Sequence, residues 1–481
     1  MVPSWIKLAV LVALISIHVD AIFLSSCFGC TCIDGSRKKI DCSSRHLTAV
    51  PDGVKNQSDI YEINLSGNNL THIRRSDFLG TTAKYVDLSN NVITAIDDDA
   101  FLRTPDIEIL DLHNNMLSAL PVALNKLTKI NTLDVRDNPH GSQPPISLTN
   151  SIMKEMGDTI QTFQFGHSRL DSWPQTIDHF QDLLDLTLDH SSDQLEVIPP
   201  RAFHSFKSTL LKLTIKNTKL KAVPLGVSSL RRIEEFHFDS NLDVGNEGVV
   251  AQAFFREDSS LKTLSLINDN LTRFPRALAY ISNLQSLDMS HNRLDFISDE
   301  SVGDLRISNL TMQYCNLDRI PGALFHLNGL KRLDMSHNNL VTVENNDIQN
   351  ILQVSNLTLS YNPIKFISNT AFGNHSELKH VDLSSTKLTA IPEAFNTTHV
   401  DKINLKDSPV DCMCDYVWVH ESIDNFQGCC NNIEESIGAY VKYYVPLCPE
   451  YIEKYGRDPS ASSSPQAHPT VAGKHCKDLI N

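Results

Sequence analysis

Residues 330–343 read LKRLDMSHNNLVTV, and residues 284–297 repeat the pattern as LQSLDMSHNRLDFI. In the first copy Asp334, Ser336 and His337 are the residue types of a serine-hydrolase triad, in which the histidine bridges the other two. Outward residues of one strand lie roughly 6 to 7 Å apart, too far for that arrangement. Because the pattern also recurs without the histidine, as LDLSNN and VDLSST, we interpret it as repeat consensus and predict no catalysis by these residues.

The wider pattern LxxLxLxxNxL recurs in about fifteen copies between residues 60 and 410. Most steps are 22 to 24 residues long, and such a period predicts a solenoid whose coils bury apolar residues only against their neighbours. We call the residues at the asparagine position the ladder residues. They are Asn68, Asn91, Asn115, Asn138, Ser168, Ser191, Thr218, Asn241, Asp269, Asn292, Cys315, Asn338, Asn362, Thr386 and Ser408.

Each position of a repeat has a physical interpretation. Alternate strand residues such as Leu333 and Met335 are expected to face the core, whereas Arg332, Asp334 and Ser336 face outward. The ladder asparagine turns inward, where its amide both donates to and accepts from backbone groups that the tight coil leaves unpaired.

Cysteines cluster at both ends of the repeats. The N-terminal group CFGCTC is followed by CSSRHLTAVP, and the C-terminal group opens with DSPVDCMCDYVWV, a Cys-x-Cys pair followed by Trp418. With the repeats, these motifs resemble secreted extracellular leucine-rich-repeat proteins with cysteine-rich caps, such as the Slit-like and small proteoglycan families. The resemblance implies a horseshoe-shaped solenoid with a parallel β-sheet on its concave face, an irregular or short-helical convex side, and disulfide caps at both ends.

The resemblance also implies that Cys27 pairs with Cys32 and that Cys30 pairs with Cys42. A zinc cluster is the alternative, but disulfides are favoured behind a secretory signal. The pairing of the six C-terminal cysteines stays open among fifteen connectivities; they are Cys412, Cys414, Cys429, Cys430, Cys448 and Cys476. We predict that the remaining cysteine, Cys315, is a buried free thiol, because its ladder position faces the core.

The sequence predicts five segments. Residues 1–21 form a signal peptide, residues 22–57 the N-terminal cap, residues 58–410 the repeats, residues 411–448 the C-terminal cap, and residues 449–481 a Pro/Ser-rich tail with Cys476. No later stretch is apolar enough to span a membrane, so the mature protein is expected to be secreted. The net charge of -15 argues against nucleic acid as a partner.

A candidate binding site occupies four neighbouring repeats. The residue before the ladder position is there His291, Tyr314, His337 and Tyr361, which should stack at roughly 5 Å intervals because neighbouring coils keep strand spacing. Tyrosine and histidine present an apolar body with a polar tip, which suits an interface. Arg332 could add a charged anchor. Longer loops between Asn138 and Asp269 are the alternative site.

Other site types receive less support. The histidines of the repeats are spread one per coil, so we predict no metal site, and no phosphate or dinucleotide motif indicates a cofactor. Glycosylation sequons stand at Asn56, Asn64, Asn69, Asn270, Asn309, Asn356, Asn374 and Asn396.

These observations predict a non-enzymatic protein that recognises an extracellular or cell-surface macromolecule through its concave face, in recognition, adhesion or innate immunity. The expected partner is an extracellular protein or a glycan-bearing one. Two alternatives remain open: a non-catalytic subunit of a secreted enzyme complex, and a structural protein of the extracellular matrix. Fold alone does not choose among them.

Overall fold

The computed structural model describes Cys476 and residues 24–456, apart from residues 28, 34, 36, 142, 191–193, 255–258, 296, 303–304, 346, 349–350 and 374. Of residues 24–27 and 420–424 only the backbone is described. The predicted signal peptide and most of the predicted tail therefore lie outside the described residues. Two compact units make up the chain, residues 1–194 and residues 195–481.

The first unit is a stack of coils that begins with an antiparallel cap. Strands β1 (Leu24–Cys27), β2 (Cys30–Ile33) and β3 (Lys38–Asp41) pair antiparallel, and β3 then pairs in parallel with the first repeat strand. The repeat strands continue in parallel and in chain order as β4 (Ile60–Asn64), β6 (Tyr85–Asp87), β8 (Ile109–Asp111), β9 (Thr132–Asp134), β10 (Thr162–Phe165) and β11 (Asp185–Leu188).

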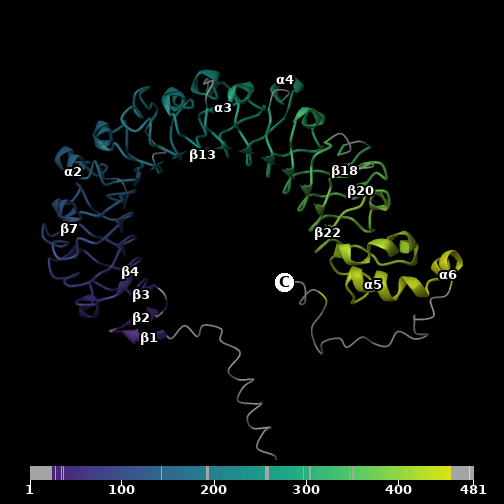
Figure 1. The fold of residues 1–481 in the computed structure, drawn as a ribbon, viewed down its shortest axis with the longest axis horizontal. Coiled ribbons are helices and arrows are strands. Elements are labelled where there is room, and N and C mark those ends of the chain that lie inside the picture. Colours follow the sequence, from purple (N-terminus) through teal and green to yellow (C-terminus); the bar gives the residue numbers. More distant parts are fainter. Residues whose placement is uncertain are drawn as a thin grey trace, which may run out of the picture. The chain divides into compact units, whose positions relative to one another are not determined.

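Short elements lie opposite these strands in the first unit (Figure 1). A small parallel sheet joins β5 (His72–Ile73) and β7 (Ala95–Ile96). The helices are η1 (Asp52–Val54), η2 (Val122–Lys126), α2 (Asn150–Glu155) and η3 (Gln175–His179).

The second unit repeats this arrangement. Its parallel strands follow in chain order as β12 (Lys212–Lys216), β13 (Glu235–Asp239), β14 (Thr263–Ser265), β15 (Ser286–Asp288), β16 (Asn309–Thr311), β17 (Arg332–Asp334), β19 (Asn356–Thr358), β21 (His380–Asp382), β22 (Lys402–Asn404) and β23 (Phe426–Gln427). In each unit we call the outward side of this sheet the strand face.

Short segments again fill the side opposite the strand face of the second unit. Strands β18 (Thr342–Val343) and β20 (Phe366–Ile367) form a small parallel sheet. The helices among the repeats are η4 (Leu225–Ser229), α3 (Gly245–Gly248), η5 (Ala251–Ala253), η6 (Arg276–Tyr280), α4 (Asp299–Val302), η7 (Gly322–His326) and η8 (Glu393–Asn396).

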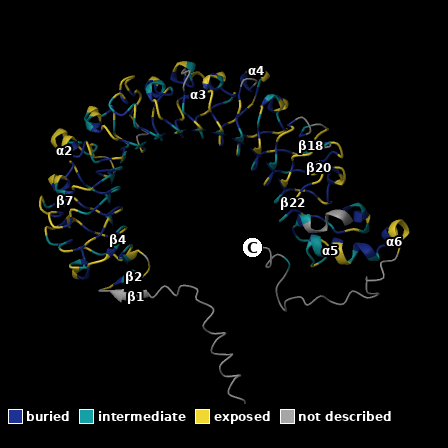
Figure 2. Ribbon diagram, viewed as in Figure 1, coloured by how far each residue is buried: buried dark blue, intermediate teal, exposed yellow. Residues whose placement is uncertain are grey.

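The core of each unit lies inside its coils, where one apolar strand residue per coil packs on the next. Figure 2 shows buried residues running through the interior of the coils and exposed residues concentrated on the side of the short helices. Leu333 is 1 % exposed and Met335 is fully buried, as the alternation of the strand predicts. The predicted solenoid of parallel strands is therefore confirmed.

The ladder asparagines satisfy the backbone as predicted. In the second unit, Asn338 Nδ2 donates to the carbonyls of Met312 at 2.8 Å and Met335 at 2.9 Å, and its Oδ1 accepts from the backbone N–H groups of Cys315 and Leu317. The side chain of Asn338 thus forms hydrogen bonds with backbone groups of two neighbouring coils. Cys315 is fully buried and is a free thiol, which confirms its prediction.

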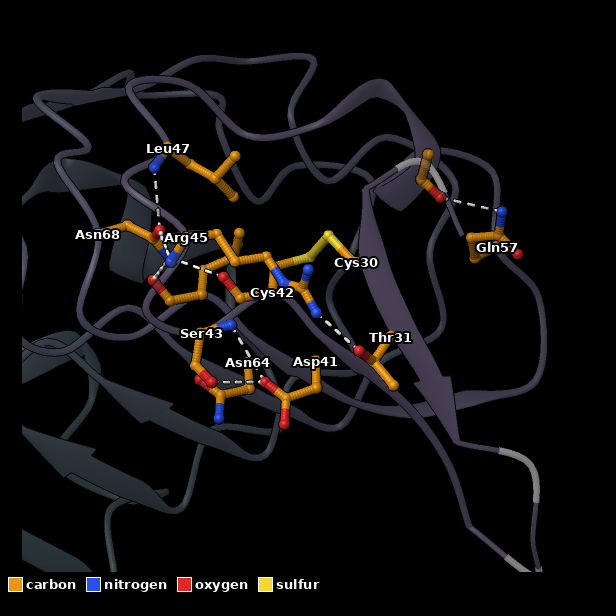
Figure 3. The surroundings of a disulfide bond; sticks show 12 residues. Cys30, Thr31, Asp41, Cys42, Ser43, Arg45, Leu47, Gln57, Asn64 and Asn68 are labelled. Atoms are coloured by element: carbon orange, nitrogen blue, oxygen red, sulfur yellow. Dashed lines mark hydrogen bonds between the residues drawn. A yellow bond between two sulfur atoms is a disulfide. The ribbon is translucent and has the colours of Figure 1, made fainter. Parts of the chain in front are cut away.

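The N-terminal cap contains the disulfide that the resemblance implies between Cys30 and Cys42 (Figure 3). The ladder residue Asn68 donates to the Cys42 carbonyl at 2.9 Å, which joins the cap to the first repeat. Cys32 is also disulfide-bonded. The side chain of Cys27, its expected partner, lies outside the described residues, so that pair stays a prediction.

The C-terminal cap selects one connectivity for its six cysteines. Disulfides join Cys412 to Cys430, Cys414 to Cys448, and Cys429 to Cys476. Its helices are η9 (Cys414–Asn425), α5 (Ile437–Tyr443), η10 (Val445–Leu447) and α6 (Pro449–Tyr455), so a helix begins where the Pro/Ser-rich tail was expected.

Candidate functional site

The residue immediately before the ladder position adopts a left-handed backbone conformation in most coils. This conformation turns the chain sharply after the strand and directs the next side chain into the core. We call these residues the turn column. With φ between 50° and 61° they include Asn90, Asn114, Asp137 and His190 in the first unit, and Asn217, Ser240, Asn268, His291, Tyr314, His337, Tyr361, Ser385 and Asp407 in the second.

Four neighbouring members of the turn column in the second unit form a stack of rings, which we call the ring stack. The ring centroids of His291 and Tyr314 are 4.5 Å apart, those of Tyr314 and His337 4.4 Å, and those of His337 and Tyr361 4.2 Å. The angles between ring planes are 13°, 14° and 8°. The predicted stacking geometry is therefore confirmed, at slightly closer spacing than expected.

The ring stack presents its edges to solvent. Tyr314 and His337 each have a ring neighbour on both faces, so only their ring edges are left to contact solvent. Tyr314 is 48 % exposed and Tyr361 is 56 % exposed. The stack is therefore a short row of hydroxyl and imidazole groups with apolar flanks.

The backbone of the turn column does not favour the two tyrosine rings. A bulky side chain is rare in the left-handed region, whereas asparagine, aspartate and histidine adopt it more readily. Elsewhere in the column most residues are short and polar, as at Asn90 and Asn114. Ring-to-ring contacts contribute about 0.5–1.5 kcal/mol each, but exposed rings add little to the core. Tyr314 and Tyr361 are thus departures from the column's usual residue types that the fold does not require.

The Asp-x-Ser motif belongs to the end of the strand. The hydroxyl and backbone N–H of Ser336 both donate to Asp334 Oδ1, at 2.7 and 2.9 Å, and Ser336 is 3 % exposed. Ser336 was expected to face outward with Asp334; its side chain does bond to that carboxylate, but the local turn leaves it buried. His337 stacks between two tyrosines, so the three residues do not assemble a triad.

Arg332 does not belong to the ring stack. It stands at the start of β17, whereas His337 lies beyond the end of that strand. Its Nε donates to Asn309 Oδ1 at 2.7 Å, and in the sheet register it lies between Asn309 and Asn356. Two sequon asparagines thus flank Arg332 on the strand face, because equivalent positions of neighbouring repeats become neighbours in space.

The remaining sequons vary in exposure. Asn64 is half-buried, and its Oδ1 accepts the hydroxyl of Ser66, the serine of its own sequon. Asn374 lies outside the described residues. The exposed sequon asparagines are Asn56, Asn69, Asn270 and Asn396.

A charged cluster lies on the strand face of the first unit. Ligand-type atoms of Asp111, His113 and Asp134 lie within 4.8 Å of one another. The hydrogen bond from His113 Nδ1 to Asp111 raises the pKa of His113, and burial raises the pKa of Asp134. Arg136 Nη2 lies 2.6 Å from Asp134 Oδ2. Since this guanidinium already binds the carboxylate, we interpret the cluster as an ion-pair network.

Sequence reasoning missed the burial of His167 and the raised pKa of Asp269. In the coil assigned to Ser168, the inward residue is instead His167, which is 1 % exposed, whereas Ser168 is half-buried. Asp269 occupies a ladder position at zero exposure, and burial raises its pKa to about 8. The 30-residue step to this coil obscured the position of His167. For Asp269 the sequence did carry a signal, namely an acidic residue at a position where most repeats have asparagine.

The parallel coils, the asparagine ladder and the disulfide-bonded ends define a capped leucine-rich-repeat solenoid. Leucine-rich-repeat models match residues 81–139, 283–305 and 306–364. The chain is 32 % identical to mimecan of Coturnix japonica over 152 residues, which are 31 % of this chain and 47 % of that protein. It is 26 % identical to epiphycan of Mus musculus over 204 residues, 42 % of this chain and 58 % of that protein.

The matched segments thus span about half the length of these relatives. A chain of the mouse RP105/MD-1 complex shares the fold with a TM-score of 0.54 at 17 % identity, covering 81 % of this chain and 75 % of that one. The similarity to mimecan and epiphycan and the disulfide-bonded caps fit a secreted protein. Among the described residues, no helix combines the length and apolar character needed to cross a membrane.

Proposed function

We propose that this chain is a secreted, non-enzymatic binding protein that recognises an extracellular macromolecule, most simply a protein, through the ring stack on the strand face of its second unit. The observation that carries this proposal is the stack of four rings, three of them exposed, in a left-handed turn column whose other members are mostly short and polar. Such rings contribute little to folding, whereas tyrosine is enriched among the residues that dominate binding energy.

Two further observations support a protein partner. The ring edges combine apolar area with hydrogen-bonding tips, which suits a partly hydrated interface. The structurally similar chain of the RP105/MD-1 complex comes from an assembly of two different proteins. Arg332 and the loops between Asn138 and Asp269 stay as secondary candidates for partner contacts.

The test is affinity purification from the native extracellular fluid, followed by mass spectrometry, with three forms of the chain. The wild type is compared with Tyr314→Asn/Tyr361→Asn, which removes two rings, and with Asn90→Ala/Asn114→Ala, which alters the same column in the first unit. We expect a partner that the wild type and the Asn90/Asn114 variant retain and that the tyrosine variant loses.

Equal recovery by all three forms would contradict the proposed site. Recovery of a separate active enzyme would instead support the role of non-catalytic subunit, and sedimentation with insoluble polymer would support a matrix role. Each outcome therefore separates one function from the others.

A further inference from the structure

A row of exposed cations lies along one edge of the strand face in the second unit, where the consecutive strands β17, β19, β21 and β22 begin. Each cation is either the first residue of a strand or the residue directly before it. We call this set the cationic row, and its members are Lys331, Arg332, Lys379 and Lys402. From β17 to β22 the row covers three strand spacings, which is about 14 to 15 Å.

Backbone hydrogen bonds fix the spacing of the cationic row. The N–H of Ser355 donates to the Lys331 carbonyl at 2.8 Å, and the N–H of Lys379 donates to the Ser355 carbonyl at 2.8 Å. The N–H of Lys402 then donates to the Lys379 carbonyl at 2.9 Å. The sheet therefore holds the bases of these side chains in line, so a ligand needs to order only the side chains themselves.

Lysines directly before other strands of the sheet are neutralised by the neighbouring coil. Lys84 Nζ lies 2.6 Å from Glu108 Oε1, and Lys262 Nζ lies 2.8 Å from Glu234 Oε2. In both pairs the glutamate also stands directly before its strand. Within the cationic row the residue at this position of the intervening coil is Ser355, which carries no charge.

The cationic row keeps its charge unpaired within the part of the chain that the structure describes. None of its four members lies in an ion pair there, and Arg332 donates to a neutral asparagine side chain. Asp334 and Asp382 stand further along their strands, and each accepts the hydroxyl and the N–H of the serine two residues later. These bonds direct both carboxylates toward the strand ends, away from the row.

Two exposed acidic residues flank the cationic row. Glu377 Oε1 accepts the hydroxyl of Ser376, and Asp401 Oδ1 lies 3.6 Å from His399 Nε2. The four cations of the row thus outnumber these acidic neighbours, although the whole chain has a net charge of -15. Because like charges repel, an acidic ligand is disfavoured over most of the surface and is attracted at the row.

We propose that the cationic row binds an extended acidic segment of the protein partner. The cations form two adjacent lines, with Lys331 and Lys379 directly before their strands and Arg332 and Lys402 at the strand starts. Side chains of an extended segment alternate between two sides at about 3.3 Å per residue. A segment of about five residues would therefore follow the row and present carboxylates to both lines.

This inference rests on the proposed function only in assigning the segment to the partner of the ring stack. Strands β17 and β19 begin at the row, and the turns that follow them carry His337 and Tyr361. One protein surface would cover both features. A sulfated polysaccharide is the other anionic class, but it has no apolar surface to offer the ring edges.

The test measures the binding of two probes of equal negative charge to the full chain with its disulfides intact. One probe is a hexa-aspartate peptide with blocked ends, and the other is a chondroitin sulfate hexasaccharide; both carry a neutral dye for fluorescence anisotropy. N-glycans are trimmed to their first sugar, because the sequon residue Asn356 lies in register with the row. We expect saturable binding of hexa-aspartate at about 20 mM salt, weaker binding of the saccharide, and loss of most binding at about 200 mM salt.

Three variants locate the binding of hexa-aspartate. Lys331→Glu/Lys379→Glu should weaken it at least about tenfold, whereas Lys331→Arg/Lys379→Arg keeps the charge and should bind like the wild type. Lys365→Glu/Lys387→Glu reverses two exposed lysines outside the row, with the same change in net charge, and should bind within about twofold of the wild type. Circular dichroism and urea unfolding will establish that all three are folded.

The outcomes separate this inference from the proposed function. Tyr314→Asn/Tyr361→Asn should keep the binding of hexa-aspartate, because the rings lie beyond the other end of the strands. Absence of saturable binding to the wild type overturns the proposal for the cationic row and leaves the ring stack to its own test. Equal weakening by the two glutamate variants, or tighter binding of the saccharide than of the peptide, would also overturn it.

Discussion

Tyr314 and Cys315 are neighbours in the chain and have opposite environments. Cys315 is fully buried and its backbone N–H bonds to the next ladder asparagine, whereas Tyr314 is 48 % exposed and contacts the rings of adjacent coils. The same contrast runs through the ladder and the turn column of both units. The ladder is constrained by the backbone groups it must satisfy, but the turn column is constrained only in its backbone, so its side chains are free to serve binding.

The largest expected effect comes from the ladder. Asn338→Ala should lower the free energy of unfolding by about 3–5 kcal/mol, because it leaves buried carbonyl and N–H groups of two coils unpaired. Urea unfolding followed by circular dichroism measures the loss. The matched control is the exposed neighbour Asn339→Ala, expected within about 0.5 kcal/mol of the wild type. Equal effects of the two variants would contradict the structural role assigned to the ladder asparagine.

The second prediction concerns Asp269, the acidic residue of the ladder. Asp269→Asn should raise the free energy of unfolding at pH 7 by about 2–4 kcal/mol. The unfolded carboxyl titrates near 3.8 and the folded one near 8. Between these pH values the folded state keeps a proton that the unfolded state has lost. The free energy of unfolding is therefore highest below about pH 4 and falls as the pH rises to 8.

Unfolding of Asp269→Asn and wild type at several pH values between 4 and 8 checks this second prediction. The variant should have the flatter profile, since its amide does not titrate. Parallel profiles would mean that Asp269 is ionised in the folded protein.

The third prediction concerns the turn column. Tyr314→Asn/Tyr361→Asn should weaken partner binding by at least about 2 kcal/mol if the rings dominate the interface. Stability should stay within about 1 kcal/mol or rise, because asparagine suits the left-handed backbone. Calorimetric titration with the purified partner and thermal unfolding measure the two effects. A large loss of stability with unchanged affinity would show that the rings serve the fold.

The smallest expected effect is at Ser336. Its hydroxyl is buried and donated to Asp334, so a serine-directed covalent probe should give no labelling by mass spectrometry. Ser290, buried beside Asp288 in the equivalent coil, provides a second position in the same experiment. Stoichiometric labelling of either serine would contradict a non-enzymatic role.

The ring stack could be predicted from the sequence because of the repeat period. Once neighbouring coils are held at strand spacing, residues at one repeat position must become neighbours, so His291, Tyr314, His337 and Tyr361 had to stack. The same reasoning predicted the buried ladder, the parallel sheet and the free thiol of Cys315. These features depend only on periodicity and on the need to pair buried backbone groups.

Other features were decided by the tertiary structure alone. The pairing of the six C-terminal cysteines depends on how η9, α5 and α6 pack, because no repeat sets their spacing. The burial of Ser336 against Asp334 depends on a local hydrogen bond that strand alternation does not include. The burial of His167 in place of Ser168 depends on the path of an insertion whose irregular length removes it from the period. Where the repeat sets each neighbour, sequence is sufficient; where contacts join segments of irregular length, only packing in three dimensions selects them.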